Sequence, residues 1–166
     1  MNNLKFEIKN LNIIFATAVA VLLLLVDVAV WSAVGSPIFI LRFISACVKV
    51  APLWLFGLLD FLSFALLGFA LGSILGTTCY VYEVFKYRGA FFFVIGLTLA
   101  FVHHITFFSA GMFLVSLLVV IVQCFFLTLS VVNFYKVSVI STVILIVGSV
   151  WWLYLLIINL FSFFMM

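Results

Sequence analysis

Six polar side chains interrupt the long apolar runs of this sequence, and they are its first candidates for chemistry. They are Asp27, Asp60, His103, His104, Gln123 and Asn159. Such groups are costly in an apolar surrounding unless they are paired, so each one marks either a function or an internal contact. If several of them face one cavity, they could hold the polar edge of a ligand or form a path for protons or cations. If they pair with one another instead, they fix the packing of the chain.

Asp60 and the two adjacent histidines give the most specific of these hypotheses. On a helix, Asp60 would lie about two turns after Pro52, and His104 about one turn before Ser109. If the two helices are antiparallel neighbours, both positions fall near the same end, which allows an Asp–His contact. Adjacent helical positions point about 100° apart, so at most one histidine faces any given pocket. Imidazole is the usual axial ligand of haem iron, but an adjacent pair alone does not define a haem site.

The composition shows which solvent surrounds these residues. Of the 166 residues, 70% are apolar and 7% are charged, whereas a soluble domain carries roughly 25% charged residues. Four acidic and seven basic side chains cannot cover a soluble surface, so we expect lipid around the chain and no nucleic acid as a partner. The three cysteines have no metal-ligand or redox spacing. We therefore assign no metal ligand and no catalytic residue from the sequence.

The polar breaks divide the chain into five apolar runs, each close to the ~20 residues that cross a bilayer. These candidate helices cover about residues 11–34, 52–80, 90–108, 112–134 and 139–163. The first run is longer than the ~7–15 residues of a signal peptide, so we expect it to be retained. The sequence predicts an all-α membrane protein, with a bundle of five transmembrane helices in a single domain over residues 1–166. The charged segment 36–51 is predicted to lie along the membrane interface.

Lysine and arginine are unevenly distributed between the two ends of the predicted helices. With five spans, one side carries Lys5, Lys9, Lys86, Arg88 and Lys136, and the other side carries Arg42 and Lys49. Because basic residues concentrate on the cytoplasmic side, the bias predicts a multi-pass protein of the cell membrane with a cytoplasmic N-terminus.

Gly68, Gly72 and Gly76 form a ridge of small residues on the second predicted helix. Such a face lets another helix approach closely, and van der Waals contact then holds the pair together. Two partners fit this ridge: another helix of the same chain, or the same ridge of a second copy in a homodimer.

Three blocks of sequence resemble the TspO/MBR family, the translocator and tryptophan-rich sensory proteins. The first is Pro52-Leu53-Trp54-Leu55-Phe56, which continues through Leu62 and Phe64 to Gly68. The second is Phe107-Phe108, similar to paired aromatic residues at the end of the family's third helix. The third is Trp151 followed by Ile158-Asn159, similar to the signature of the fifth helix. Their order and spacing, the chain length and the five-span layout also fit this family.

The sequence departs from the family pattern at several of these positions. Asp60 stands where the family has a tryptophan, and Phe64 stands where it has a tyrosine. Ala100 and His103 replace an asparagine and a tryptophan, and Val147-Gly148 replaces a Pro-Tyr pair. These changes leave the fold expectation stronger than the ligand expectation.

The resemblance implies a protein that binds a flat hydrophobic molecule, such as a porphyrin or a sterol, between its helices, for sensing or for transport. The pocket positions that it transfers are Trp54, Phe56, Asp60, Phe64, His103, Phe107, Trp151 and Leu155. The cofactor it implies is a bound porphyrin or haem, whose carboxylates could meet Arg42 or Lys49. Porphyrin degradation has been linked to tryptophans that this chain has partly lost, so we do not expect an enzyme.

Two other functions remain open from the residues alone. Asp27, Asp60 and the histidine pair would suit a small proton- or cation-coupled transporter. The glycine ridge would suit a membrane scaffold subunit that works through helix contacts.

The membrane assignment predicts how the protein behaves on fractionation. The untagged chain should stay in the membrane pellet after washing with alkaline carbonate, because its apolar helices cannot be transferred to water. Immunoblotting of pellet and supernatant measures this, and complete release into the supernatant would contradict the assignment.

Overall fold

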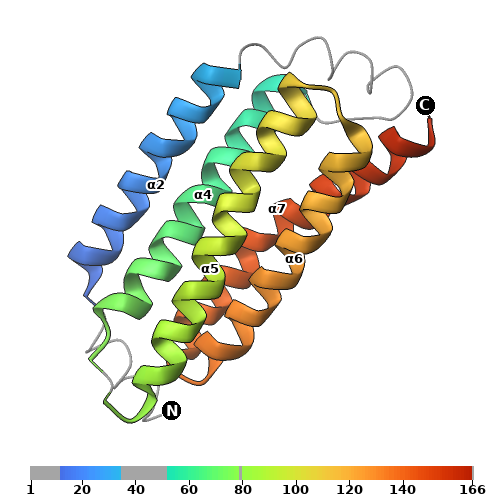
Figure 1. The fold of residues 1–166 in the computed structure, drawn as a ribbon. Helices are drawn as coiled ribbons and strands as arrows, with labels where there is room; N and C mark the ends of the chain where they lie inside the picture. The colour runs from blue at the N-terminus through green and yellow to red at the C-terminus, as the bar shows by residue number, and fades with distance from the viewer. Residues whose placement is uncertain (1–11, 35–51, 79, 166) are drawn as a thin grey trace.

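The computed structural model describes residues 12–34, 52–78 and 80–165. Five long helices make up most of this described part: α2 (Ile13–Val34), α4 (Leu53–Gly76), α5 (Glu83–His104), α6 (Phe113–Tyr135) and α7 (Val139–Phe164) (Figure 1). A 3₁₀ turn, η1 (Tyr80–Tyr82), precedes α5, and a π-helical turn, η2 (Ile105–Ser109), follows it. No strand occurs among the described residues. The predicted all-α five-helix bundle is confirmed, and the segment 36–51 lies outside the described residues.

Each of these helices is long and apolar enough to cross a membrane. Large apolar side chains such as Leu25, Phe125 and Leu153 are exposed on the outer surface of the bundle. In water such a surface would drive aggregation, whereas lipid accepts it. The chain is therefore a multi-pass integral membrane protein.

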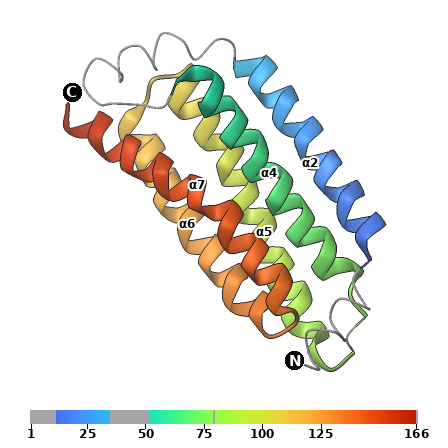
Figure 2. The same cartoon turned by 180° about the vertical axis from the view of Figure 1, so that it is seen from behind.

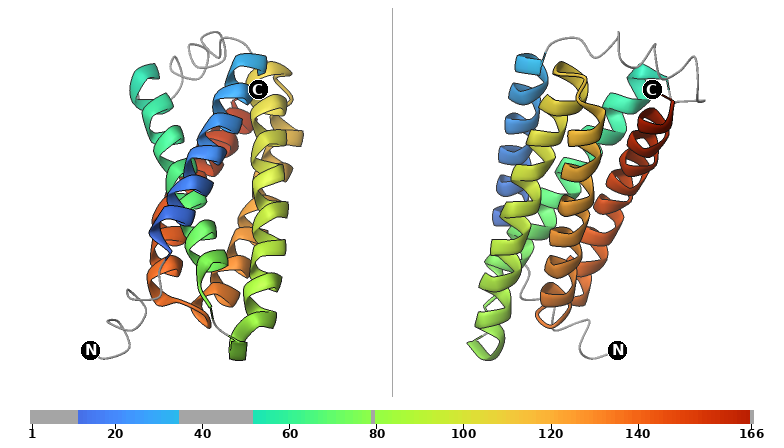
Figure 3. Two further views of the ribbon diagram at one scale, coloured as in Figure 1. Left: turned by 90° about the vertical axis from the view of Figure 1, so that its left-hand side faces the viewer. Right: turned by 45° about the vertical axis from the view of Figure 1, so that its right-hand side comes forward.

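The helices pack in a definite order around the bundle. α2 packs on α4, α4 on α7, α7 on α6, and α6 on α5, while α5 also contacts α2 and α4. Figures 1 and 2 show this arrangement from opposite sides, and Figure 3 shows it from two intermediate directions. The end of α2, the start of α4, the end of α5 and the end of α7 lie at the same end of the bundle. We call this the Val34 end.

The boundary between the second and third spans differs from the predicted one. α4 ends at Gly76 and α5 begins at Glu83, whereas the apolar runs extend to about 80 and start at about 90. Lys86 lies inside α5 and is largely buried, and its Nζ donates to the Thr77 carbonyl at 2.9 Å. This bond pairs the charged Lys86 side chain with a carbonyl next to the end of α4. The charge is thus accommodated within α5, and the predicted loop is helical.

A side-chain cap marks where α7 begins, and a glycine conformation shapes the connection from α5 to α6. Ser138 caps α7, because its hydroxyl accepts the backbone N–H of Ser141 at 3.3 Å. Gly111 adopts a φ of 62° in the connection before α6, a conformation that residues with a Cβ atom rarely adopt. The cap satisfies a backbone N–H at the start of α7, and the glycine allows the tight connection between η2 and α6.

The glycine ridge on α4 packs against α2. A Cβ atom at Gly68 would lie 2.7 Å from the Ala20 Cα, and one at Gly72 would lie 2.7 Å from the Ala16 Cα. These are backbone atoms, so they cannot move away without separating the helices. Of the two partners that the sequence left open, the structure pairs this ridge with a helix of the same chain.

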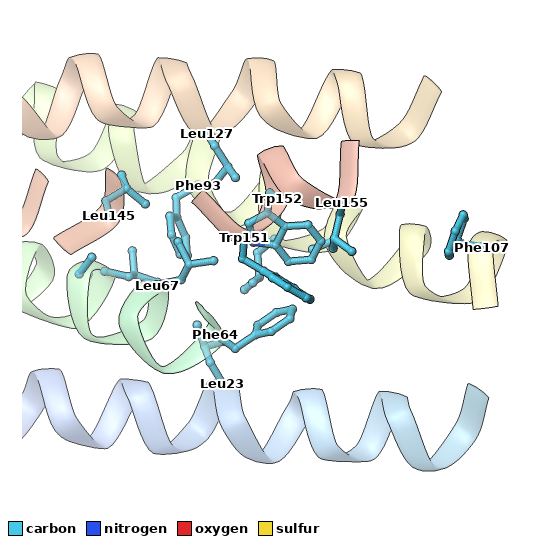
Figure 4. Close-up of a cluster of buried hydrophobic side chains, with 14 of the residues drawn as sticks. Leu23, Phe64, Leu67, Phe93, Phe107, Leu127, Leu145, Trp151, Trp152 and Leu155 are labelled. Carbon is cyan, nitrogen blue, oxygen red and sulfur yellow. The ribbon is translucent and has the colours of Figure 1, made fainter. Parts of the chain in front are cut away.

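The core between the helices is strongly aromatic. Phe64, Trp151 and Trp152 gather between α4 and α7, and Leu23 reaches toward them from α2 (Figure 4). Phe64 meets Trp152 edge to face, with ring centroids 5.6 Å apart. Edge-to-face pairs of this kind add to the packing energy and restrict ring rotation.

The close approach of α2 and α4 gives a testable prediction. Gly72→Ala should destabilise the protein by about 1–3 kcal/mol, because the added methyl overlaps the backbone of Ala16. Thermal unfolding in one detergent, followed by circular dichroism, measures the difference.

Gly57, which lies on the same helix, provides the matched control. A Cβ atom there would meet nothing within 4 Å. Gly57→Ala should therefore leave stability unchanged or raise it by up to about 1 kcal/mol through helix propensity. Equal effects at both glycines would contradict the packing argument.

Candidate functional site

The carboxylate of Asp60 is the centre of a buried hydrogen-bond network. Its Oδ1 accepts the indole N–H of Trp151 at 2.6 Å, and its Oδ2 accepts the indole N–H of Trp31 at 2.7 Å. The Nε2 of His104 lies 2.9 Å from the same Oδ2. Asp60 has no exposed surface, so these groups replace the water that an exposed carboxylate would bind.

The contact made by Nδ1 of His104 determines which ring nitrogen carries the hydrogen when the ring is neutral. Nδ1 lies 2.9 Å from the carbonyl oxygen of Ala100, and it must donate because that oxygen can only accept. In the neutral ring, Nε2 would then carry a lone pair that faces the Asp60 carboxylate. A proton or another cation must therefore lie between His104 and Asp60 for their contact to be attractive.

His103 belongs to a separate part of the network. Its Nε2 lies 2.9 Å from the side-chain nitrogen of Asn159, which also donates to the Leu155 carbonyl at 2.8 Å. The side-chain oxygen of Asn159 accepts the hydroxyl of Ser116 on α6. His103 Nε2 therefore accepts, which places the hydrogen on Nδ1. That atom has no hydrogen-bond partner among the described residues.

Asp27 on α2 is fully buried next to Asp60 and His104. A ligand atom of each of these three residues lies within 4.8 Å of the other two. Neither carboxylate oxygen of Asp27 has a hydrogen-bond partner among the described residues. Asp27, Asp60 and His104, with the indoles of Trp31 and Trp151, form the polar centre of the bundle. It contains two carboxylates and one imidazole, and the Asp27 carboxylate is unpaired.

Most of the ligand-binding residues predicted from the sequence come together in this core. Seven of them are buried there: Phe56, Asp60, Phe64, His103, Phe107, Trp151 and Leu155. Their rings touch, with centroids 4.7 Å apart for Phe56 and Trp151 and 5.5 Å apart for His103 and Phe107. The eighth, Trp54, is 71% exposed on the outside of α4.

A groove of about 360 Å³ lies beside this core, between α4 and α7. Its lining includes Leu62, Ser63, Val147, Gly148, Trp151 and Tyr154. The Ser63 hydroxyl donates to the Gly148 carbonyl at 2.7 Å, so it adds little polarity to the wall. Exposed Leu62 and Val147 place the groove on the lipid-facing surface. Of the predicted ligand-binding residues, only Trp151 is among its lining residues.

Three residues of the polar centre, Asp27, Trp31 and His104, were not among the predicted ligand-binding residues. Trp31, one turn after Asp27 on α2, donates its indole N–H to Asp60. His104 contacts Asp60, whereas the family resemblance pointed to its neighbour His103. The sequence signal for Trp31 was its spacing of four residues from Asp27, which places both side chains on one face of a helix.

The fold and the site together define a helical membrane protein with a polar centre buried among aromatic side chains. No family model, curated protein or solved structure matches the chain. The likeness to the TspO/MBR family therefore stays a prediction from the sequence blocks.

The network predicts a large loss of stability when Asp60 is neutralised. In Asp60→Asn, the amide N–H₂ group faces one of the two indole donors, so at least one buried N–H loses its acceptor. We expect a cost of about 3 kcal/mol, measured by thermal unfolding in detergent without divalent cations.

Asp27→Asn is the matched control, since the described residues donate no hydrogen bond to that carboxylate. Its stability under the same conditions should equal or exceed that of the wild type, because a buried unpaired charge is removed. A larger loss at Asp27 than at Asp60 would contradict the network.

Proposed function

We propose that the protein binds a flat hydrophobic molecule, of the porphyrin or sterol kind, in the groove between α4 and α7. The observation that carries this proposal is the position of Trp151. Trp151 lines the groove, and its indole N–H is bonded to Asp60. The ring is thus held in a fixed orientation before any ligand arrives, which lowers the entropy cost of binding.

The shape and chemistry of the groove support such a ligand. Its volume of about 360 Å³ falls at the lower end of the roughly 300–1,000 Å³ of small-molecule pockets. Trp151 and Tyr154 lie next to each other, with ring centroids 5.1 Å apart, and aromatic faces suit a planar partner. Gly148, where an added Cβ would lie 3.1 Å from the Leu66 Cβ, lets α4 and α7 approach closely beside the groove.

The groove supports binding better than catalysis. Among its described lining residues, none has a carboxylate, imidazole or thiol group. The ionisable residues Asp60 and His104 lie behind Trp151 in the core and are fully buried. A ligand would enter from the lipid side, which fits a protein that senses or carries a hydrophobic compound in the membrane.

The proposal is tested by titrating metal-free protoporphyrin into the full-length protein in detergent. Quenching of tryptophan fluorescence should saturate at low micromolar concentration. Val147→Phe should weaken binding about tenfold or more, equivalent to about 1.4 kcal/mol, because the larger ring occupies part of the groove.

Val143 provides the matched control. It lies one turn away on the same helix, and its exposure, 53%, is nearly that of Val147 at 54%, but it is not among the groove-lining residues. Val143→Phe should leave the affinity unchanged. An absence of saturable quenching, or equal affinities for both variants, would refute the proposal.

A further inference from the structure

Asp27 is the buried group that the hydrogen-bond network leaves unexplained. Its carboxylate is fully buried, and both oxygens lack a partner among the described residues. One of these oxygens belongs to the cluster with Asp60 and His104. A buried carboxylate without a partner is strongly unfavourable in a membrane interior, so its position next to two further ligand-type groups calls for a cation.

The described chain offers no lysine or arginine that could neutralise Asp27. The lysines and arginine among the described residues are Lys86 and Arg88, in the first two turns of α5, and Lys136, directly after α6. The start of α5 and the end of α6 lie opposite the Val34 end (Figure 1). Lys86 precedes His104 by eighteen positions on one helix, or about 27 Å at 1.5 Å per residue. With His104 as an imidazolium, two carboxylates still leave a net charge of −1 in the core.

We propose that Asp27, Asp60 and His104 bind one divalent transition-metal ion of the Zn²⁺ type. A charge of +2 balances the two carboxylates when His104 is neutral, and its Nε2 lone pair then becomes a ligand. Carboxylate oxygen and imidazole nitrogen are common zinc ligands, and three protein ligands leave a fourth position for water. Ca²⁺ and Mg²⁺ fit less well, because they need six or more ligands and prefer oxygen.

The surroundings of each ligand support this assignment. The N–H of a metal-bound histidine usually donates to a carbonyl or carboxylate, and His104 Nδ1 faces the Ala100 carbonyl. Ligating carboxylates are also held by hydrogen bonds, and indole donors from Trp31 and Trp151 hold Asp60. Each Asp60 oxygen has two lone pairs, so it can accept an indole N–H and still bind an ion.

The test uses Co²⁺ as the probe and the full-length protein in detergent, stripped beforehand with a chelator. One equivalent of Co²⁺ should bind, with visible absorption bands typical of tetrahedral coordination. Tryptophan fluorescence should fall, because Trp31 and Trp151 both contact Asp60. Zn²⁺ should displace Co²⁺, because its filled d shell gives it no preference against tetrahedral coordination. A wild-type protein without saturable binding would overturn the proposal and leave protons as the occupants of this centre.

Two substitutions test whether the ion binds to the cluster of Asp27, Asp60 and His104. Asp27→Asn should weaken Co²⁺ binding about 100-fold or more, since loss of an outer-shell partner alone typically costs 10–100-fold. His103→Gln, which removes the adjacent histidine outside the cluster, should keep the wild-type affinity. Unchanged binding in Asp27→Asn, or an equal loss in His103→Gln, would overturn the assignment.

A further variant keeps the proposal testable if Asp27→Asn does not fold. Trp31→Phe keeps all three ligands and removes one hydrogen bond to Asp60, so it should weaken binding about tenfold. Wild-type affinity in this variant would count against Asp60 as a ligand. The porphyrin titration uses the groove and a metal-free probe, so failure of either test leaves the other result standing.

Discussion

Asp60 is a carboxylate in a core surrounded by hydrocarbon, and the packing of this bundle depends on the groups that pair with it. Asp60 on α4 contacts Trp31 on α2, His104 on α5 and Trp151 on α7. Rotation of any of these helices by one residue would break one of these contacts and leave a buried group unpaired, at a cost of about 1–3 kcal/mol. α6 joins the network through Ser116 and Asn159. One buried charge thus restricts the relative rotation of four helices directly and of the fifth indirectly.

Polar and small-residue contacts matter here because apolar burial discriminates poorly inside a membrane. Lipid tails are as apolar as leucine, so helices gain specificity from close backbone contact and from hydrogen bonds. α2 shows both along one stripe of residues three or four positions apart: Ala16 and Ala20 meet the glycines of α4, and farther along Trp31 donates to Asp60. The close approach at one end of the stripe positions the polar side chains at the other. The glycine ridge and the polar centre therefore act on the same helix pair.

The sequence predicts the number and approximate limits of the spans because composition alone decides what lipid accepts. It also identifies Asp60 as a residue that needs a partner. It does not identify that partner, because His103 and His104 point about 100° apart and the rotation of α5 depends on contacts with other helices. The start of α5 at Glu83 was missed for a related reason. The charge of Lys86 indicates a loop, and only the position of the Thr77 carbonyl shows how the charge is accommodated.

Trp151 belongs both to the lipid-facing groove and to the polar centre, which ties the two proposals together. A ligand that shifts its ring in the groove also shifts the N–H that holds Asp60, and an ion that draws Asp60 away changes the ring's orientation. If both sites bind, linkage requires each ligand to change the affinity of the other by the same factor. A porphyrin affinity that is identical with and without Zn²⁺ would show that the ring does not couple them. A changed affinity would mean that Trp151 couples ion binding in the core to ligand binding in the lipid-facing groove.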